Sequence, residues 1–123
     1  MSKILLVDDD EVFNESLREY LEYKGFTVLS AFNGKQGLDM ITTDSPDLVI
    51  TDIVMPEFEG IELLTAVVID SVKAKPKIIV ISGGGRIGSS NYLSVAKEMG
   101  ADAVFEKPLE FKLLVEEIKR LLA

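Results

Sequence analysis

Short apolar runs that each end at a reactive polar residue constrain the fold of this chain more than any other feature. Four such runs are present, over residues 3–7, 47–51, 77–81 and 103–106, and they are followed by Asp8 and Asp9, Asp52, Ser82 and Lys107. Runs of this length, separated by stretches with helical spacing, are typical of strands buried on both faces of a parallel sheet. Because parallel strands end at one edge, and open α/β sheets bind ligands at that edge, we expect these polar side chains to meet there.

The segments between these runs predict helices and one further strand. Asp10 is a candidate N-cap for a helix over residues 11–24, which Gly25 ends. Residues 26–30 alternate like an edge strand, and a second helix runs from Asn33 to just before Ser45 and Pro46. Later helices are predicted at residues 61–68, 92–99 and 109–122. Alternation of this kind, with right-handed crossovers, predicts a doubly wound α/β fold, in which a five-stranded parallel sheet lies between two layers of helices.

Composition excludes several kinds of chemistry. The 123 residues suit one domain, and they include no cysteine and no histidine. A thiolate or histidine metal site, a histidine general base and a phosphohistidine on this chain are therefore excluded. A net charge of −8 argues against broad contact with nucleic acid or anionic lipid. No apolar run reaches membrane-spanning length and the first strand begins too early for a signal peptide, so we predict a cytoplasmic protein without membrane insertion.

The three aspartates at the predicted sheet edge indicate a cation site. Two carboxylates about 4 Å apart repel by about 4 kcal/mol at an effective dielectric constant near 20. A cation, a raised pKa or both must compensate, and Mg²⁺ suits one or two carboxylates together with water and a phosphoryl group. Asp8, Asp9 and Asp10 could instead merely cap a helix. Capping does not explain Asp52, which ends a second buried strand.

Lys107 and Ser82 complete the predicted cluster. A lysine facing carboxylates can neutralise charge on a transferring phosphoryl oxygen, although a structural ion pair is the plain alternative. The Ser82 hydroxyl and the Gly83 backbone amide could donate hydrogen bonds to a phosphoryl oxygen, although Ser82 could simply cap its strand. Each residue alone is a weak signal. Together, at four successive strand ends, they predict a metal and phosphoryl site.

These motifs resemble the receiver domain of two-component response regulators along essentially the whole chain. The matching segments are residues 4–10, residues 47–56, Gly60, Ser82 with Gly83, residues 100–102, and Lys107 with Pro108. The resemblance implies a single receiver domain over residues 1–123, with the flavodoxin-like strand order 2-1-3-4-5.

The resemblance also implies a role for each site residue. Asp52 would accept a phosphoryl group from a phosphohistidine on a histidine kinase or histidine phosphotransfer protein. Mg²⁺ would be held by Asp9, Asp52 and the Val54 backbone carbonyl, and by Asp8 mainly through water. Lys107 would contact the phosphoryl group, aimed by a cis peptide bond before Pro108.

Ser82 would be the switch hydroxyl whose movement orders the mobile loop over residues 83–90. The resulting signal would be a protein contact, because no output module follows the last helix. Leu113, opposite the apolar face of that helix, is a weak hint of a partner surface. The chain departs from the family at Val104, where Tyr or Phe is usual.

Three other interpretations compete with this one. Residues 83–88 match G-x-G-x-x-G, but they follow the fourth strand and leave too little chain for a dinucleotide site. The start Asp8-x-Asp10 matches haloacid-dehalogenase-type phosphatases, in which Asp8 would be the nucleophile and Asp10 the acid/base, with Ser82 and Lys107 in support. That family needs a further acidic pair, and only glutamates on the last helix follow Lys107. An adaptor that is never phosphorylated would not need the complete set of site residues.

Overall fold

The computed structural model describes residues 2–52, 76–82 and 100–123. Within them, five strands form one sheet: β1 (Lys3–Val7), β2 (Thr27–Ala31), β3 (Leu48–Asp52), β4 (Lys77–Ser82) and β5 (Ala103–Glu106). Three helices are α1 (Glu11–Tyr23), α2 (Gly34–Asp44) and α5 (Phe111–Leu122). The predicted strands and helices in these parts of the chain are confirmed.

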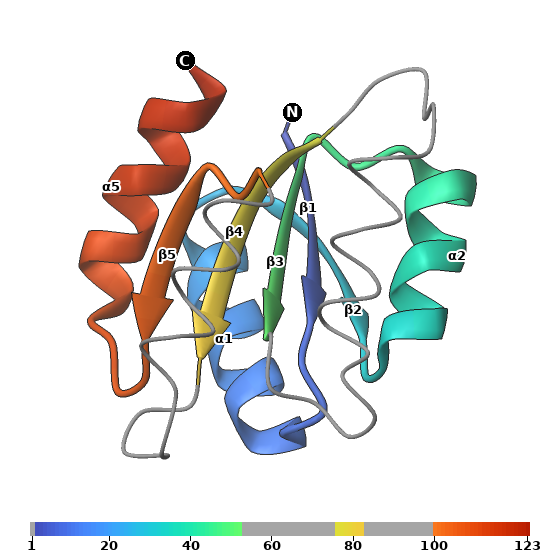
Figure 1. Ribbon diagram of the computed structural model, residues 1–123. Coiled ribbons are helices and arrows are strands. Elements are labelled where there is room, and N and C mark those ends of the chain that lie inside the picture. Colours follow the sequence, from blue (N-terminus) through green and yellow to red (C-terminus); the bar gives the residue numbers. More distant parts are fainter. Residues whose placement is uncertain (1, 53–75, 83–99) are drawn as a thin grey trace.

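All neighbouring strands are parallel, and their order is β2-β1-β3-β4-β5. This confirms the predicted doubly wound topology, with β2 at an edge and β3 in the centre. The arrowheads of all five strands point to the same edge of the sheet, which is the lower edge in Figure 1. In the register, Val7 lies beside Thr51, Asp52 beside Ile81, and Ser82 beside Glu106. The residues that follow the apolar runs therefore meet at one edge.

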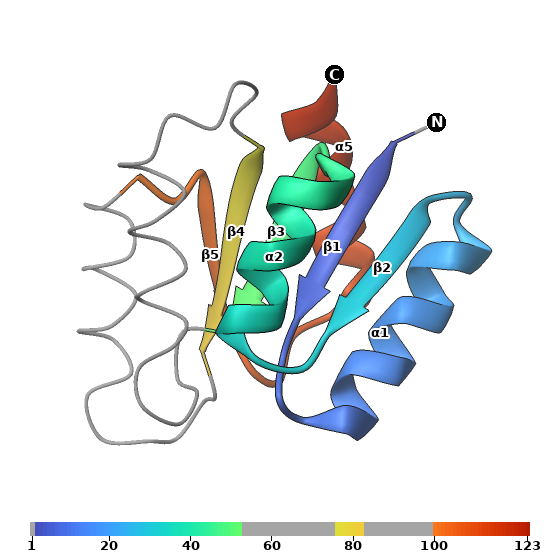
Figure 2. The same cartoon turned by 90° about the vertical axis from the view of Figure 1, so that its right-hand side faces the viewer.

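Helices cover both faces of the sheet. Helices α1 and α5 lie on one face and α2 lies on the other, as the two views show together (Figures 1 and 2). Side chains alternate between the faces of a strand, so every second residue of β1, β3 and β4 packs under α1 and α5. The main core contains these buried side chains: Ile4, Leu6, Leu17, Leu21, Val28, Leu48, Ile50, Ile79, Ile81, Leu114, Val115 and Ile118.

Local sequence signals set the ends of the helices. Asp10 is the N-cap of α1 and Asn33 the N-cap of α2, each accepting a hydrogen bond from a backbone N–H three residues later. Gly25 has a φ of 98°, a left-handed conformation that glycine adopts without strain, and it ends the α1 segment. Some predicted bounds are wrong by one or two residues. Strand β2 begins at Thr27 rather than at residue 26. Helix α5 begins at Phe111 rather than at residue 109, because the backbone of Glu110, its N-cap, is still extended.

Several predictions fall outside the described residues. They are the helices at residues 61–68 and 92–99, the loop at 83–90, the Val54 carbonyl, the Gly83 amide, and the motif residues Met55, Pro56 and Gly60. Among the helices that the structure describes, none is long and apolar enough to cross a membrane.

Candidate functional site

Three carboxylates meet at the edge of the sheet where β1 and β3 end. Asp8, Asp9 and Asp52 each offer an oxygen, and these oxygens all lie within 4.8 Å of one another. Asp8 is 1% and Asp52 5% exposed, whereas Asp9 is exposed to solvent. The predicted acidic cluster is therefore confirmed, with two carboxylates buried and one at the surface.

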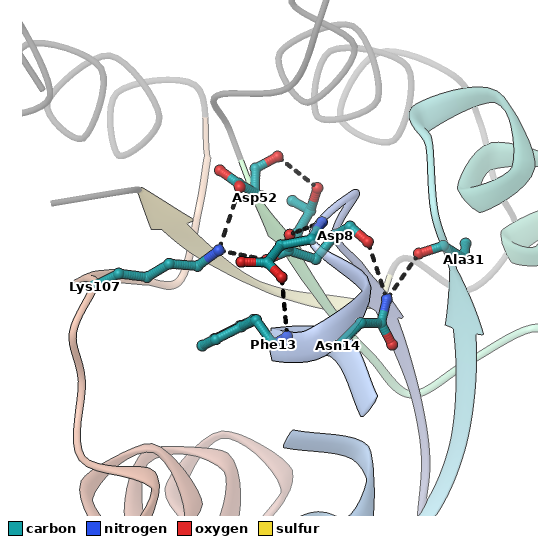
Figure 3. Close-up of polar contacts among 8 residues, drawn as sticks. Asp8, Phe13, Asn14, Ala31, Asp52 and Lys107 are labelled. Carbon is teal, nitrogen blue, oxygen red and sulfur yellow. Dashed lines mark hydrogen bonds and ion pairs between the residues drawn. The ribbon is translucent and has the colours of Figure 1, made fainter. Parts of the chain in front are cut away.

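Lys107 reaches into this cluster from the end of β5. Its ammonium lies 2.8 Å from Asp8 Oδ2 and 3.5 Å from Asp52 Oδ2 (Figure 3). The Lys107 backbone N–H donates a hydrogen bond to the Ser82 carbonyl oxygen at 2.7 Å, which ties the end of β5 to the end of β4. The predicted cis peptide bond between Lys107 and Pro108 is also confirmed. The lysine thus serves as the counter-charge that the acidic cluster requires.

The protonation of this site reflects both burial and charge. Burial raises the pKa of the Asp8 carboxyl above its ordinary value, and hydrogen bonds from Lys107 and from the Asp10 N–H oppose the rise without cancelling it. Burial alone would lower the pKa of Lys107, but the carboxylates of Asp8, Asp52 and Asp10 outweigh it and raise that pKa. At neutral pH, Lys107 is therefore a fixed positive charge, while burial disfavours the charged form of Asp8.

Ser82 ends β4 beside the cluster. The residue is fully buried, and its Oγ has no hydrogen-bond partner among the residues that the structure describes. A plain strand-capping role would give this hydroxyl a backbone partner. Within the described parts of the chain, nothing occupies this buried hydroxyl, so a group that enters the site could bind it.

Two residues of α1 contribute to the site without having been predicted to do so. The Asn14 amide nitrogen donates hydrogen bonds to the carbonyl oxygens of Asp8 and Ala31, both at 3.1 Å, and so fastens the end of β1 to the end of β2. The sequence contains a signal for Asn14, because this residue lies three positions before Leu17 and seven before Leu21, both of which are buried. These positions share one face of the helix, where a polar residue is unexpected. The other residue is Phe13, whose ring lies 4.0 Å from the Lys107 ammonium. Phe13 is also partly buried against the hydrophobic core.

Asp10 takes no direct part in the cluster. It is exposed, and its Oδ1 accepts a hydrogen bond from the Phe13 N–H at 3.1 Å. This is an N-cap contact. It engages the Asp10 carboxylate, which the phosphatase interpretation requires as the acid/base.

The donor set suits a hard divalent cation. The grouped ligands are all carboxylate oxygens, which Mg²⁺ prefers, and the cluster is open to water at Asp9. The site therefore combines carboxylates that could hold a metal ion, a lysine that could neutralise anionic oxygens, and a hydroxyl without a partner in the described parts of the chain.

Comparison with known proteins identifies the family. The family model of the response regulator receiver domain matches residues 4–119, so the chain belongs to that family. The chain is 37% identical to the transcriptional regulatory protein CpxR of Escherichia coli. The match covers 99% of this chain but only half the length of CpxR. It is 31% identical to the sporulation initiation phosphotransferase F of Bacillus subtilis, covering 98% of this chain and 93% of the relative.

Solved structures agree with this assignment. A putative response regulator of Chloroflexus aurantiacus superposes with a TM-score of 0.88 at 29% identity, covering 98% of this chain and 97% of the other. A CheY-like receiver domain of Methanospirillum hungatei gives a TM-score of 0.81 at 32% identity, covering 99% and 94%. The chain is thus a phosphoacceptor signalling domain of the two-component phosphorelay type, and neither the phosphatase nor the adaptor interpretation is favoured.

Proposed function

We propose that Asp52 is the phosphoacceptor of this domain, and that its partner is a histidine kinase or a histidine phosphotransfer protein. The observation that carries the proposal is the position of the Lys107 ammonium, which bridges Asp8 and Asp52 across the ends of two strands. A positive charge at this point lies where the oxygens of a phosphoryl group on Asp52 would need it.

The transfer requires little covalent chemistry from the protein. A carboxylate oxygen of Asp52 attacks the phosphorus, the bond between phosphorus and the histidine nitrogen breaks, and that nitrogen leaves with the electron pair. Lys107, the Ser82 hydroxyl and the Gly83 amide spread the negative charge on the equatorial oxygens. The product is an acyl phosphate, which the same residues hold until water hydrolyses it. The domain therefore promotes a phosphoryl transfer to itself and is not an enzyme acting on other substrates.

The metal of this site is Mg²⁺ in our proposal. Asp9, Asp52 and the Val54 carbonyl would bind it directly, and Asp8 mainly through water. When bound, Mg²⁺ neutralises charge on the incoming phosphoryl oxygens. Asp8 orients the site by accepting hydrogen bonds from the Lys107 ammonium at 2.8 Å and from the Asp10 N–H at 2.9 Å.

The phosphorylated state would be read by a protein partner. A doubly charged phosphoryl group would attract the Ser82 hydroxyl, which has no partner among the described residues. Movement of Ser82 toward this group would shift the segment that follows β4. The net charge of −8 disfavours nucleic acid as a direct target. We therefore propose that this domain, acting in the cytoplasm, signals through protein contacts.

The test is phosphorylation of matched variants by acetyl phosphate in the presence of Mg²⁺. The unchanged protein and Asp39→Asn, which alters an exposed aspartate on α2, should gain one phosphoryl group by mass, in a form that hydroxylamine removes. Asp52→Asn should gain none. Full labelling of Asp52→Asn would contradict the assignment of the phosphoacceptor.

A further inference from the structure

The Lys107 ammonium has an aromatic neighbour besides the carboxylates of Asp8 and Asp52, with which it forms ion pairs. It lies 4.0 Å from the centre of the Phe13 ring, well within the roughly 6 Å at which a cation is attracted to the face of an aromatic ring. In Figure 3, Asp52 lies above the Lys107 ammonium, Phe13 lies below it, and Asp8 lies to its right. In this view, the ring is on the side of the ammonium away from the proposed phosphoacceptor.

The ring is itself held in place from two directions. Phe13 lies in the first turn of α1, and its backbone N–H is bound by the Asp10 side chain. Its ring meets Phe111 of α5 edge to face, with centroids 6.0 Å apart, and Phe111 packs on Tyr20 at 5.4 Å. These contacts join the first turn of α5 to α1. A ring fixed in this way can fix the position of a flexible lysine.

We infer that Phe13 is a positioning residue for phosphoryl transfer, which holds the Lys107 ammonium toward the carboxylates through a cation–π contact. This inference rests on the proposed function of Lys107. The four-carbon stem of lysine has many conformations, and only those that aim the ammonium at Asp52 assist the transfer. The ring favours those conformations and shields one side of the ammonium from water. Because the ring is neutral, it adds no fixed charge that would compete with the phosphoryl group for Lys107.

The contact makes a prediction for the unphosphorylated, metal-free protein. The ε-methylene protons of Lys107 should resonate upfield of those of the other lysines in NMR spectra, because they lie near the face of a ring. Phe13→Leu should abolish this shift, whereas Phe111→Leu, which removes the neighbouring ring, should largely retain it. An unshifted Lys107 signal in the unchanged protein would show that the contact does not exist in solution, whatever the site does with phosphate.

The functional test changes the electron density on the face of the Phe13 ring and keeps the shape of the ring nearly constant. Phenylalanine analogues with one, two and three fluorine atoms are introduced at position 13, and the rate of phosphorylation by acetyl phosphate with Mg²⁺ is measured. Fluorine withdraws electron density from the ring face, so the rate should fall stepwise, by roughly threefold to tenfold over the series, and by a similar factor in Phe13→Leu. The same analogues at position 111 are the control, because that ring shares the edge-to-face pair but has no contact with the ammonium.

The outcomes separate this inference from the proposed function. If the unchanged protein accepts phosphate on Asp52 and the rate is independent of fluorination at position 13, the ring serves only packing and the inference is wrong. If the unchanged protein accepts no phosphate, the proposed function fails, and the NMR shift still reports whether the contact exists. A decrease at position 13 that position 111 does not share supports the inference.

Discussion

Burial of the Asp8 carboxylate should lower the stability of the unphosphorylated protein. This carboxylate is 1% exposed, and burial raises its pKa above the ordinary value of 3.8 despite the hydrogen bonds from Lys107 and Asp10. A raised pKa means that the folded protein binds this proton more tightly than the unfolded chain does. The free energy of unfolding should therefore fall as the pH rises from the ordinary pKa of 3.8 through the raised pKa of the folded protein.

Replacing Asp8 with asparagine should therefore stabilise the unphosphorylated protein at neutral pH. We expect a gain on the order of 1 kcal/mol in the free energy of unfolding, the usual size for substitutions that relieve a functional site. The gain should shrink as the pH falls and vanish below about 3.8, where Asp8 is protonated in both states. Urea unfolding over a pH series measures this, with Asp39→Asn as the control. Lower stability of Asp8→Asn at neutral pH would show that pairing with Lys107 outweighs the burial.

Asp9 should dominate the affinity for magnesium. It is the exposed member of the acidic cluster, and in our proposal it is one of two side chains that bind the ion directly. Loss of outer-shell partners alone weakens metal sites by about 10- to 100-fold, so Asp9→Ala should weaken Mg²⁺ binding by at least about tenfold. Calorimetric titration of Asp9→Ala against Asp39→Ala measures the difference. Equal affinities would place the ion elsewhere or make Asp8 the direct ligand.

At the scale of elements, α1 connects the site to the helical layer. Its N-cap fixes the first turn, Asn14 fastens β1 to β2, and Phe13 contacts both Lys107 and Phe111. In β5, Val104 occupies the position where the family usually has an aromatic residue, and it lies half-buried beside Val80 of β4. Among the described residues, the aromatic contacts that begin beside Lys107 run from Phe13 to Phe111 and Tyr20.

The cap of α1 can be tested separately from the chemistry of the site. Asp10→Ala removes the acceptor of the Phe13 N–H, and we expect it to lower the free energy of unfolding by about 1 kcal/mol. Asp10→Asn retains a capping oxygen and should restore most of that loss. Urea unfolding compares the two variants, and equal stability of both would show that the cap contributes nothing.

Asp10→Asn also distinguishes the receiver from a phosphatase. A phosphatase that uses Asp10 as its acid/base would lose turnover in this variant. The receiver should still accept phosphate on Asp52, because the Asp10 side chain is bound to the backbone of α1.

At the scale of the whole molecule, the sequence was sufficient to predict the order of the sheet and the meeting of three aspartates with Lys107 at its edge. The apolar runs predicted β1, β3, β4 and β5 because strands buried on both faces tolerate few polar residues, and the parallel topology then gathered the polar residues at their ends. The ends of helices were less predictable, since capping energies of about 1 kcal/mol compete with other local preferences.

The contacts that sequence reasoning missed depend on the distance between elements. Phe13 has the spacing of a core residue. Its contact with the Lys107 ammonium is visible only in the structure, because Lys107 follows β5, far along the sequence from α1. The Ser82 hydroxyl, which has no partner among the residues that the structure describes, likewise depends on what other elements bring near it. Periodicity describes one element at a time, so it predicts which residues face inward but not which of them meet.

The central strand, which ends at the proposed phosphoacceptor Asp52, should contribute much of the stability of the molecule. Ile50 is fully buried in β3, two residues before Asp52 and on the face covered by α1 and α5. Ile50→Ala should lower the free energy of unfolding by about 2–5 kcal/mol through lost burial and the cavity left behind, and Ile50→Val by about 0.5–1.5 kcal/mol. Leu113→Ala is the control, because Leu113 is 51% exposed and its loss should change stability by no more than about 0.5 kcal/mol. Urea unfolding measures all three, and a loss in Leu113→Ala as large as in Ile50→Ala would contradict this description of the core.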